Sequence, residues 1–228
     1  MNTEGTLIVL CGIDGSGKTA QTEMLCRRLE ESERNVQYLE FPRYSEGFFG
    51  DLIARYLRGE FAPQAGEIDP YLASLPFACD RWEARPQLER WLEDGATVIC
   101  NRYVSANLAH QGGKLKSPAE RKRFRRWVEK MEYEVFEIPR PDLHVWLDVP
   151  AGVALRLIRG KGEREYLAGG EDIHEKDIEH LRTTRGMYKL LALNSSTWCT
   201  INCAPDGPML SRTEIADRVW DAVETVLI

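Results

Sequence analysis

Residues Gly12–Thr19 read GIDGSGKT and decide the fold of this chain. They match the pattern G-x-x-x-x-G-K-[ST], in which glycines allow successive backbone N–H groups to turn inward around phosphate oxygens. The segment directly follows an apolar run, Thr6–Cys11, and directly precedes a helical pattern, Lys18–Ser32. A buried strand before the loop and a helix after it are the context that this motif requires. The sequence therefore predicts a cradle for the phosphates of a nucleoside triphosphate, with an incidental glycine-rich turn as the alternative.

Side chains inside the cradle have separate expected roles. The helix N-terminus adds partial positive charge, Lys18 reaches the outer phosphates, and the Thr19 hydroxyl can ligate Mg²⁺. Lys18 is therefore a catalytic candidate and Thr19 the candidate metal ligand. The candidate triphosphate-binding residues are Gly12, Gly15, Ser16, Gly17, Lys18 and Thr19.

Short apolar runs alternate with longer helical patterns along the chain, which is typical of βαβ units around a parallel sheet. We therefore predict an α/β fold in a single domain over residues 1–228, with a five-stranded parallel sheet and helices on both faces. The pattern over Pro70–Leu92 is interrupted by Pro76 and Pro86, so two or three helical pieces are expected there. The predicted strands are Thr6–Cys11, Val36–Phe41, Ala96–Cys100, Leu143–Val149 and Trp198–Asn202.

Composition and charge exclude several function classes. The net charge of −6 argues against general binding of nucleic acid or of an anionic membrane, because both need a positive field. The six cysteines are scattered, which favours buried thiols in a reducing compartment over a zinc site or a disulfide framework. No apolar run reaches the length of about 18 residues that a membrane span needs. We expect a cytoplasmic protein with no nucleic-acid or membrane partner.

Two charged segments need an interpretation. Glycines punctuate the stretch between the helical patterns Ala151–Ile158 and His174–Leu193, as expected of a flexible surface loop, so a mobile lid is predicted at about residues 156–172. The basic run Arg121–Arg126 lies in a helix expected over Ser117–Val135. Its acidic neighbours Glu120, Glu129 and Glu132 favour a solvated helix face over a nucleic-acid site.

Arginines follow two of the predicted strands. Arg43 comes after Val36–Phe41, and Arg102 comes after Ala96–Cys100. Ligands of open α/β sheets bind beyond the carboxyl ends of the strands, so both arginines can face the cradle. A guanidinium offers a planar fork for phosphate, and two of them could hold an acceptor phosphate in line with the donor. Ordinary surface ion pairs are the alternative for each.

Five short segments stand in the order and spacing of one enzyme family: Phe41–Arg43, Phe77–Arg81, Arg102-Tyr103, Gln111–Gly113 and Pro141–Leu143. Through these segments the chain resembles the thymidylate kinases nearly from end to end. The resemblance implies a P-loop kinase that phosphorylates dTMP to dTDP, with ATP as the phosphoryl donor, Mg²⁺ as cofactor, and a homodimeric assembly. Another nucleoside or nucleoside-monophosphate kinase, and a non-catalytic P-loop regulator, are the alternatives.

The resemblance also implies how the acceptor is read. Phe77 would stack on the thymine ring, Arg81 would donate to its O4, and Asn107 falls where the family reads the N3 edge. Asp14 would accept from the sugar 3′-hydroxyl, and Tyr103 would pack where a 2′-hydroxyl would lie. Arg43 and Arg102 would hold the acceptor phosphate. The candidate dTMP-binding residues are Asp14, Pro42, Arg43, Leu57, Phe77, Arg81, Arg102, Tyr103, Asn107 and Gln111.

Structural roles are the alternatives for most of these residues. Phe77 could be a core aromatic, Tyr103 a packing residue, and Asp14 a cap for the loop backbone. Arg81 could instead pair with the acidic residues Asp80 or Glu83 of its own helix.

Two further features qualify the resemblance. The family usually carries Asp before the Arg-Tyr pair, whereas this chain has Asn101, which removes a negative charge near the expected Mg²⁺. The variable positions of the cradle hold no arginine, as in the subgroup that delivers a catalytic arginine by lid closure. In this chain that arginine would be Arg159 or Arg164, alongside Lys18 and Arg102 as catalytic candidates.

Overall fold

The computed structural model describes residues 5–44, 46–62, 67–160, 178–193 and 195–227. Its centre is a five-stranded parallel sheet, as the sequence predicts, and the strand order is β2-β3-β1-β4-β5. The predicted strand positions agree with the observed ones to within one residue at either end. The strands are β1 (Thr6–Cys11), β2 (Val36–Glu40), β3 (Thr97–Asn101), β4 (Leu143–Asp148) and β5 (Trp198–Asn202).

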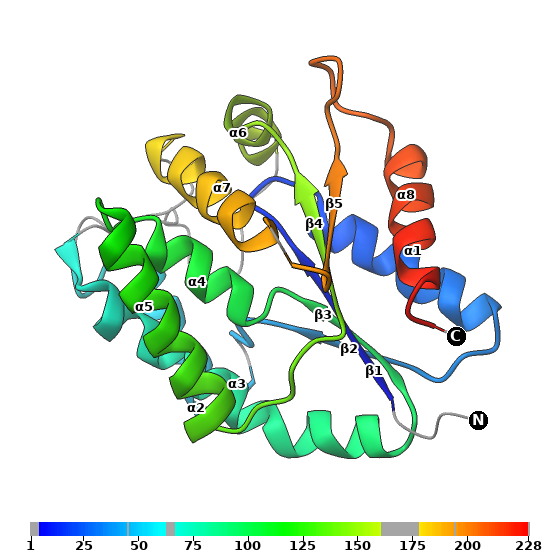
Figure 1. The fold of residues 1–228 in the computed structure, drawn as a ribbon, viewed down its shortest axis with the longest axis horizontal. Coiled ribbons are helices and arrows are strands. Elements are labelled where there is room, and N and C mark those ends of the chain that lie inside the picture. Colours follow the sequence, from blue (N-terminus) through cyan, green and yellow to red (C-terminus); the bar gives the residue numbers. More distant parts are fainter. Residues whose placement is uncertain (1–4, 45, 63–66, 161–177, 194, 228) are drawn as a thin grey trace.

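Helices cover both faces of the sheet, which confirms the predicted class (Figure 1). α1 (Lys18–Glu31) and α8 (Arg212–Glu224) lie together on one face. α3 (Pro70–Glu93), α4 (Val104–Gly112) and α7 (Ile178–Ala192) lie on the other. The remaining helices are α2 (Phe48–Leu57), which packs on α3, α5 (Pro118–Lys130), which packs on α4, and α6 (Ala151–Arg159), which follows β4.

The central strand explains why the apolar run Thr6–Cys11 shows no alternation. From Leu7 to Cys11 every residue is at most 1% exposed, because helices cover the strand on both faces. The same holds for β3, whose five residues are all buried. The residues that follow the carboxyl ends of β1 and β3 are therefore attached to fully buried strands.

The expectation of two or three helical pieces over Pro70–Leu92 is wrong. α3 is one helix of 24 residues, although Pro76 and Pro86 lie inside it. A proline leaves the carbonyl four residues before it without its helical partner. Those carbonyls belong to Leu72 and Trp82, residues that are 64% and 50% exposed, so both prolines act on the side of α3 that the described part of the chain leaves uncovered.

α5 continues directly into a π-helical turn, η2 (Met131–Val135). The two elements together cover the helix predicted over Ser117–Val135. Ser117 and Glu120 form a capping box at its start. The basic residues Lys122, Arg123 and Arg125 are exposed, as expected of a solvated face. Glu132 is not part of that face, because it is 0% exposed.

Two remaining expectations concern membrane spans and the lid. Among the helices described, none combines the length and apolarity needed to cross a bilayer. Of the predicted lid, residues 156–159 form the last turn of α6, and residues 161–172 lie outside the described residues.

Candidate active site

The loop after β1 has the backbone of a phosphate cradle. Gly15 and Gly17 have φ values of 77° and 88°, a left-handed conformation that side chains disfavour. Gly15 also lies so close to the carbonyl of Ala154 on α6 that a Cβ would clash. Gly17 is the N-cap of α1, so the loop delivers its N–H groups to the helix N-terminus. The glycines predicted for triphosphate binding are therefore required by backbone geometry.

Lys18 and Ser16 lie inside this loop as the motif predicts. Nζ of Lys18 donates to the carbonyls of Gly12 and Ile13 at 3.0 and 2.9 Å, so the ammonium group is held against the cradle. The Ser16 hydroxyl is buried and has no hydrogen-bond partner among the described residues. An orphaned buried hydroxyl inside a cradle is suited to a phosphate oxygen.

Asp14 and Arg102 form an ion pair across the site. Asp14 belongs to the cradle, and Arg102 follows β3 with its backbone N–H donating to Leu10 of β1 at 2.9 Å. Burial alone would raise the pKa of Asp14, but the positive charges of Arg102 and Lys18 outweigh it, so the pKa lies well below its usual range. Asp14 is therefore ionised, and Arg102 is fixed where the sequence places it, facing the cradle.

Arg102 has a second neighbour that the sequence reasoning missed. Its Nη1 lies 3.4 Å from Nε2 of His110, and Nδ1 of His110 lies 3.2 Å from Nε2 of His180 on α7. Burial lowers the pKa of His110 well below its ordinary value, and the nearby cations Arg102 and Lys18 lower it further, while Asp14 opposes them. A neutral imidazole at this point adds no charge to the phosphate site.

Asn101 connects the cradle to the neighbouring strand. Its Nδ2 donates to Glu40 Oε1 at 2.9 Å, and the same atom lies 3.5 Å from Oγ1 of Thr19, the candidate metal ligand. Glu40 is the register partner of Asn101 on β2, and Tyr38 donates to its other oxygen at 3.1 Å. This chain has no acidic residue at position 101, but Glu40 on the adjacent strand places a carboxylate beside Asn101.

Arg43 is held by acidic residues of α3 and is not an isolated surface arginine. Its Nε donates to Asp80 Oδ1 at 2.9 Å, its backbone N–H donates to Asp80 Oδ2 at 3.0 Å, and Nη2 donates to Glu83 at 3.1 Å. Burial raises the pKa of Asp80, although Arg43 opposes the shift. Asp80 and Glu83 thus partner Arg43, and they do not partner Arg81 as one sequence alternative held. The next residue back, Pro42, is buried.

A small apolar cluster surrounds Phe77. Leu57, Ile53 and Tyr56 of α2 form its buried part, and Phe77 is only partly buried against it. The rings of Phe77 and Tyr56 meet edge to face with centroids 5.9 Å apart. Phe77 is therefore not a fully enclosed core residue, which leaves ring surface for a ligand.

Lys114 lies at the rim of this cluster. Its Nζ donates to the Tyr56 hydroxyl at 2.8 Å, and burial lowers the pKa of Lys114 to about 8. Sequence reasoning did not single out this lysine, which directly follows the Gln111–Gly113 turn.

Glu132 contacts both Arg81 and Asn107, although the sequence analysis placed it on a solvated helix face. Arg81 donates to both carboxylate oxygens of Glu132, from Nε at 2.5 Å and from Nη2 at 2.7 Å. Asn107 donates from Nδ2 to Glu132 Oε1 at 3.1 Å and to the Ser74 carbonyl at 3.2 Å. The amide oxygens of Asn107 and of Gln111, one turn later on α4, are buried without a partner in the described part of the chain. Two predicted site residues thus present free acceptors from one helix face.

Tyr103 is a predicted site residue whose side chain is completely buried. It is 0% exposed, its hydroxyl donates to the Pro139 carbonyl at 3.0 Å, and its ring lies 5.8 Å from that of Phe41. A side chain with no accessible surface packs in the core, which is the alternative the sequence left open. The place of Tyr103 beside the sugar stays a prediction.

The lid candidates fall at the edge of the described structure. Arg159 is exposed in the last turn of α6. Arg164 lies outside the described residues.

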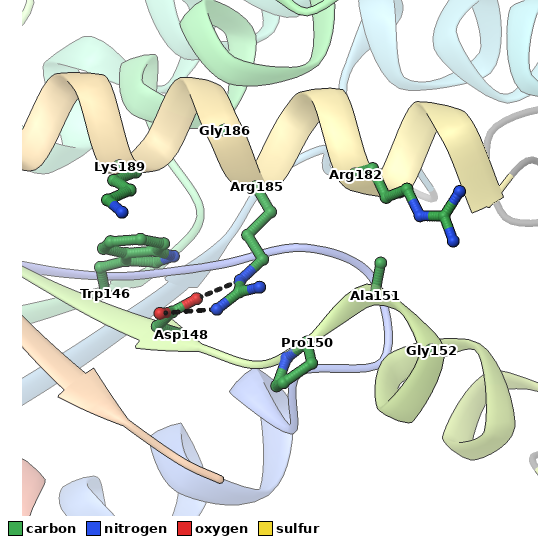
Figure 2. Close-up of a pocket in the computed structure, with 9 residues that line it drawn as sticks. All are labelled: Trp146, Asp148, Pro150, Ala151, Gly152, Arg182, Arg185, Gly186 and Lys189. Carbon is green, nitrogen blue, oxygen red and sulfur yellow. Dashed lines mark hydrogen bonds and ion pairs between the residues drawn. The ribbon is translucent and has the colours of Figure 1, made fainter. Parts of the chain in front are cut away.

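A pocket of about 430 Å³ opens between α7 and the junction of β4 with α6 (Figure 2). Arg182, Arg185 and Lys189 of α7 line its upper side, and Asp148 and Trp146 of β4 lie opposite. Asp148 accepts both ends of the Arg185 guanidinium, at 2.5 and 3.0 Å, which ties β4 to α7. Among the described residues, no predicted site residue lines this pocket.

The missed acidic residues had sequence signals of different strength. Phe124, Val128 and Glu132 follow one another at helical i, i+4 spacing, so Glu132 continues an apolar stripe that ought to face the core. Glu40 lies near the end of the predicted strand Val36–Phe41, and its side-chain direction follows from the strand period. Arg43, the partner of Asp80 and Glu83, comes from the segment after β2, and no local sequence pattern reveals its contact with α3.

A family model, curated relatives and a solved structure all match this chain, and all are thymidylate kinases by description. A family model described as thymidylate kinase matches residues 10–211. The chain is 31% identical to a thymidylate kinase of Mycobacterium tuberculosis over 209 residues, which cover 91% of this chain and 96% of that protein. It is 35% identical over 194 residues to a probable thymidylate kinase of Pyrococcus horikoshii, covering 82% and 83% respectively. The solved thymidylate kinase from Candida albicans matches with a TM-score of 0.72 at 19% identity, over 97% of this chain and 92% of that one, which shows a shared fold.

Proposed function

The chain belongs to the thymidylate kinase family, and from that premise we propose that it transfers the γ-phosphoryl group of ATP to dTMP, giving dTDP and ADP. The observation that carries the proposal is the ion pair between Asp14 and Arg102. It joins the loop that would hold the donor phosphates to the arginine that would hold the acceptor phosphate. A phosphoryl transfer needs this kind of fixed geometry more than it needs a strong base.

The roles of the site residues follow from their surroundings. Lys18 and the cradle N–H groups would hold the triphosphate, and Arg43 and Arg102 the acceptor phosphate. Phe77 would stack on the base, with Leu57 and Pro42 as apolar walls. Arg81 would donate to O4, and the free acceptor of Asn107 supports a contact with N3–H. The partly buried ring of Phe77 and the anchored guanidinium of Arg43 support these assignments.

We propose that Mg²⁺ is bound at the Thr19 side of the cradle. The fit rests on oxygen donors, which Mg²⁺ prefers: the Thr19 hydroxyl, the buried and unpartnered Oδ1 of Asn101, and the Glu40 carboxylate beside it. The ion would neutralise charge on the donor phosphates. Glu40 would restore the negative charge that the family usually has at position 101.

The proposal also covers a lid, the assembly and the location of the protein. We propose that a lid over about residues 156–172 closes during the reaction, with Arg159 or Arg164 supplying positive charge to the transferring group. A homodimer is supported by a stripe of exposed apolar side chains on α3, formed by Leu72, Leu75 and Trp82. A cytoplasmic location agrees with six cysteines that are all free thiols.

A panel of acceptors tests the proposed substrate. Release of ADP from ATP–Mg²⁺ would be measured with dTMP, dCMP, dAMP, dGMP and unphosphorylated thymidine at equal concentrations. The proposal predicts the highest kcat/KM with dTMP. A clear preference for another monophosphate or for thymidine would sink it, and thermal stabilisation by ATP–Mg²⁺ without turnover of any acceptor would favour a non-catalytic nucleotide-binding protein.

A further inference from the structure

Glu132 is a completely buried carboxylate in the acceptor side of the site. It is 0% exposed, and it accepts three hydrogen bonds, two from Arg81 and one from Asn107. Burial of a carboxylate is costly unless a cation and further donors compensate it, and here both are present. It is delivered by the π-turn Met131–Val135, in which Phe136 N–H donates to the Met131 carbonyl five residues back at 2.9 Å. Such turns occur frequently at functional sites.

The position of Glu132 fixes which end of the Asn107 amide faces a ligand. Both neighbours of Nδ2, the Glu132 carboxylate and the Ser74 carbonyl, can only accept hydrogen bonds. The NH₂ group must therefore point at them, and both of its hydrogens are used. The oxygen of Asn107 is left as a pure acceptor, buried and without a partner in the part of the chain that the structure describes.

Glu132 fixes Arg81 in a complementary way. The carboxylate takes Nε and Nη2 of the guanidinium side-on, which holds its plane and leaves Nη1 for another acceptor. Arg81 is 2% exposed, so this pairing also supplies the counter-charge that its burial requires. One carboxylate thus sets a donor and an acceptor side by side.

We propose that Glu132 is a positioning residue. By orienting Asn107 and Arg81, it sets the preference of the acceptor site for thymine or uracil over cytosine. This inference rests on the proposed function, in which those two residues read the base. A donor beside an acceptor matches thymine and uracil, whose O4 accepts and whose N3–H donates. Cytosine offers the reverse pattern, an amino donor at C4 and an acceptor at N3. Its amino group would face the donor of Arg81, and its N3 would face the acceptor oxygen of Asn107.

Glu132→Gln is the direct test because it replaces one carboxylate oxygen by NH₂. Wherever that NH₂ lies, it faces a donor of Arg81 or of Asn107, so the arrangement cannot persist. If Asn107 turns its oxygen toward the new NH₂, its own NH₂ then faces the base, which suits cytosine. We expect the ratio of kcat/KM for dTMP over that for dCMP to fall at least about tenfold, with KM for dTMP changing more than kcat. KM for ATP should not change.

Controls separate positioning from folding. Glu134→Gln alters an exposed carboxylate of the same π-turn and should leave the ratio unchanged. Glu132→Asp keeps the charge but withdraws the carboxylate by one methylene, so it should also lower the ratio, and it decides the matter if Glu132→Gln does not fold. Wild-type ratios in both Glu132 variants would overturn the inference.

A double-mutant cycle tests whether Glu132 acts through Asn107. In an Asn107→Ala background, the further change Glu132→Gln should alter the ratio less than it does in the wild-type background, because only Arg81 is left for Glu132 to orient. An equal loss in both backgrounds would contradict the inference. If the wild-type protein does not phosphorylate dTMP at all, the proposed function fails first, whereas an active wild type with unaltered Glu132 variants removes the inference alone.

Discussion

Nη2 of Arg102 donates to Oδ1 of Asp14, and this contact joins the residue after β3 to the phosphate loop after β1. Arg102 adopts a left-handed backbone conformation, with φ of 68°, which a non-glycine residue rarely takes. Uncommon backbone conformations of this kind are often found at functional sites. The pair holds a cation at the cradle before any ligand arrives.

The Asp14–Arg102 pair should matter for both stability and turnover. Arg102→Met leaves the buried Asp14 carboxylate without its main counter-charge, so the free energy of unfolding at pH 7 should fall by on the order of 3 kcal/mol. Turnover should fall as well, because the acceptor phosphate loses a ligand. Arg125→Met removes the exposed Arg125–Glu129 pair and is the matched control, with an expected loss below about 0.5 kcal/mol. Urea unfolding measures both, and equal losses would contradict the role given to the pair.

Glu40 should tune the requirement for Mg²⁺. Glu40→Gln removes the carboxylate beside Asn101 and Thr19, so the Mg²⁺ concentration for half-maximal activity should rise about three- to tenfold. Binding of Mn²⁺ in the presence of a non-hydrolysable ATP analogue, followed by electron paramagnetic resonance, should weaken in parallel. Removal of the metal with a chelator should abolish turnover. Glu31→Gln, at the exposed end of α1, is the control, and an unchanged metal requirement in Glu40→Gln would reject the assignment.

Much of the fold was predictable because its signals are local. The run Thr6–Cys11, the cradle and the start of α1 lie next to one another in sequence, and each pattern specifies the next. The continuity of α3 was not predictable in this way. Whether a proline ends a helix depends on whether the freed carbonyl reaches water, and that depends on which side of the helix is covered by the rest of the chain.

The site was predictable residue by residue but not as a network. Arg43, Arg81 and Asn107 could be named from the sequence, whereas their partners Asp80 and Glu132 are fixed by packing between distant elements. Glu132 was assigned to a solvated face because its neighbours in sequence are charged, although its spacing from Val128 and Phe124 places it on the buried face.

His144 should make stability depend on pH. It is 7% exposed and stacks on Trp198 with ring centroids 4.5 Å apart, and burial lowers its pKa to about 4. An unfolded histidine has a pKa of about 6.5, so the unfolded chain binds the extra proton first as pH falls below that value. Its contribution to stability is complete above pH 6.5 and is lost toward pH 4, by at most about 1.4 kcal/mol per pH unit. His144→Gln should therefore flatten the decline of the unfolding free energy between pH 7 and pH 5 in urea titrations. Parallel curves for the two proteins would refute this.

The exposed stripe on α3 should hold two copies of the chain together. Leu72 and Trp82, at 64% and 50% exposure, lie on the same helix, and Asp at both positions should convert a dimer to a monomer in sedimentation velocity. Leu190→Asp changes a similarly exposed leucine on α7 and should leave the assembly intact. Loss of the dimer in the control, or its survival in the double variant, would place the interface elsewhere.

The most direct test of the account follows the phosphoryl group itself. Wild-type protein would be mixed with ATP, Mg²⁺ and dTMP, and ³¹P NMR would record the phosphorus signals over time. The account predicts that the β-phosphate signal of dTDP grows as ATP becomes ADP, and that Lys18→Ala slows this growth at least about 100-fold while remaining folded. Consumption of ATP with the dTMP signal unchanged, or transfer at the wild-type rate by Lys18→Ala, would contradict it.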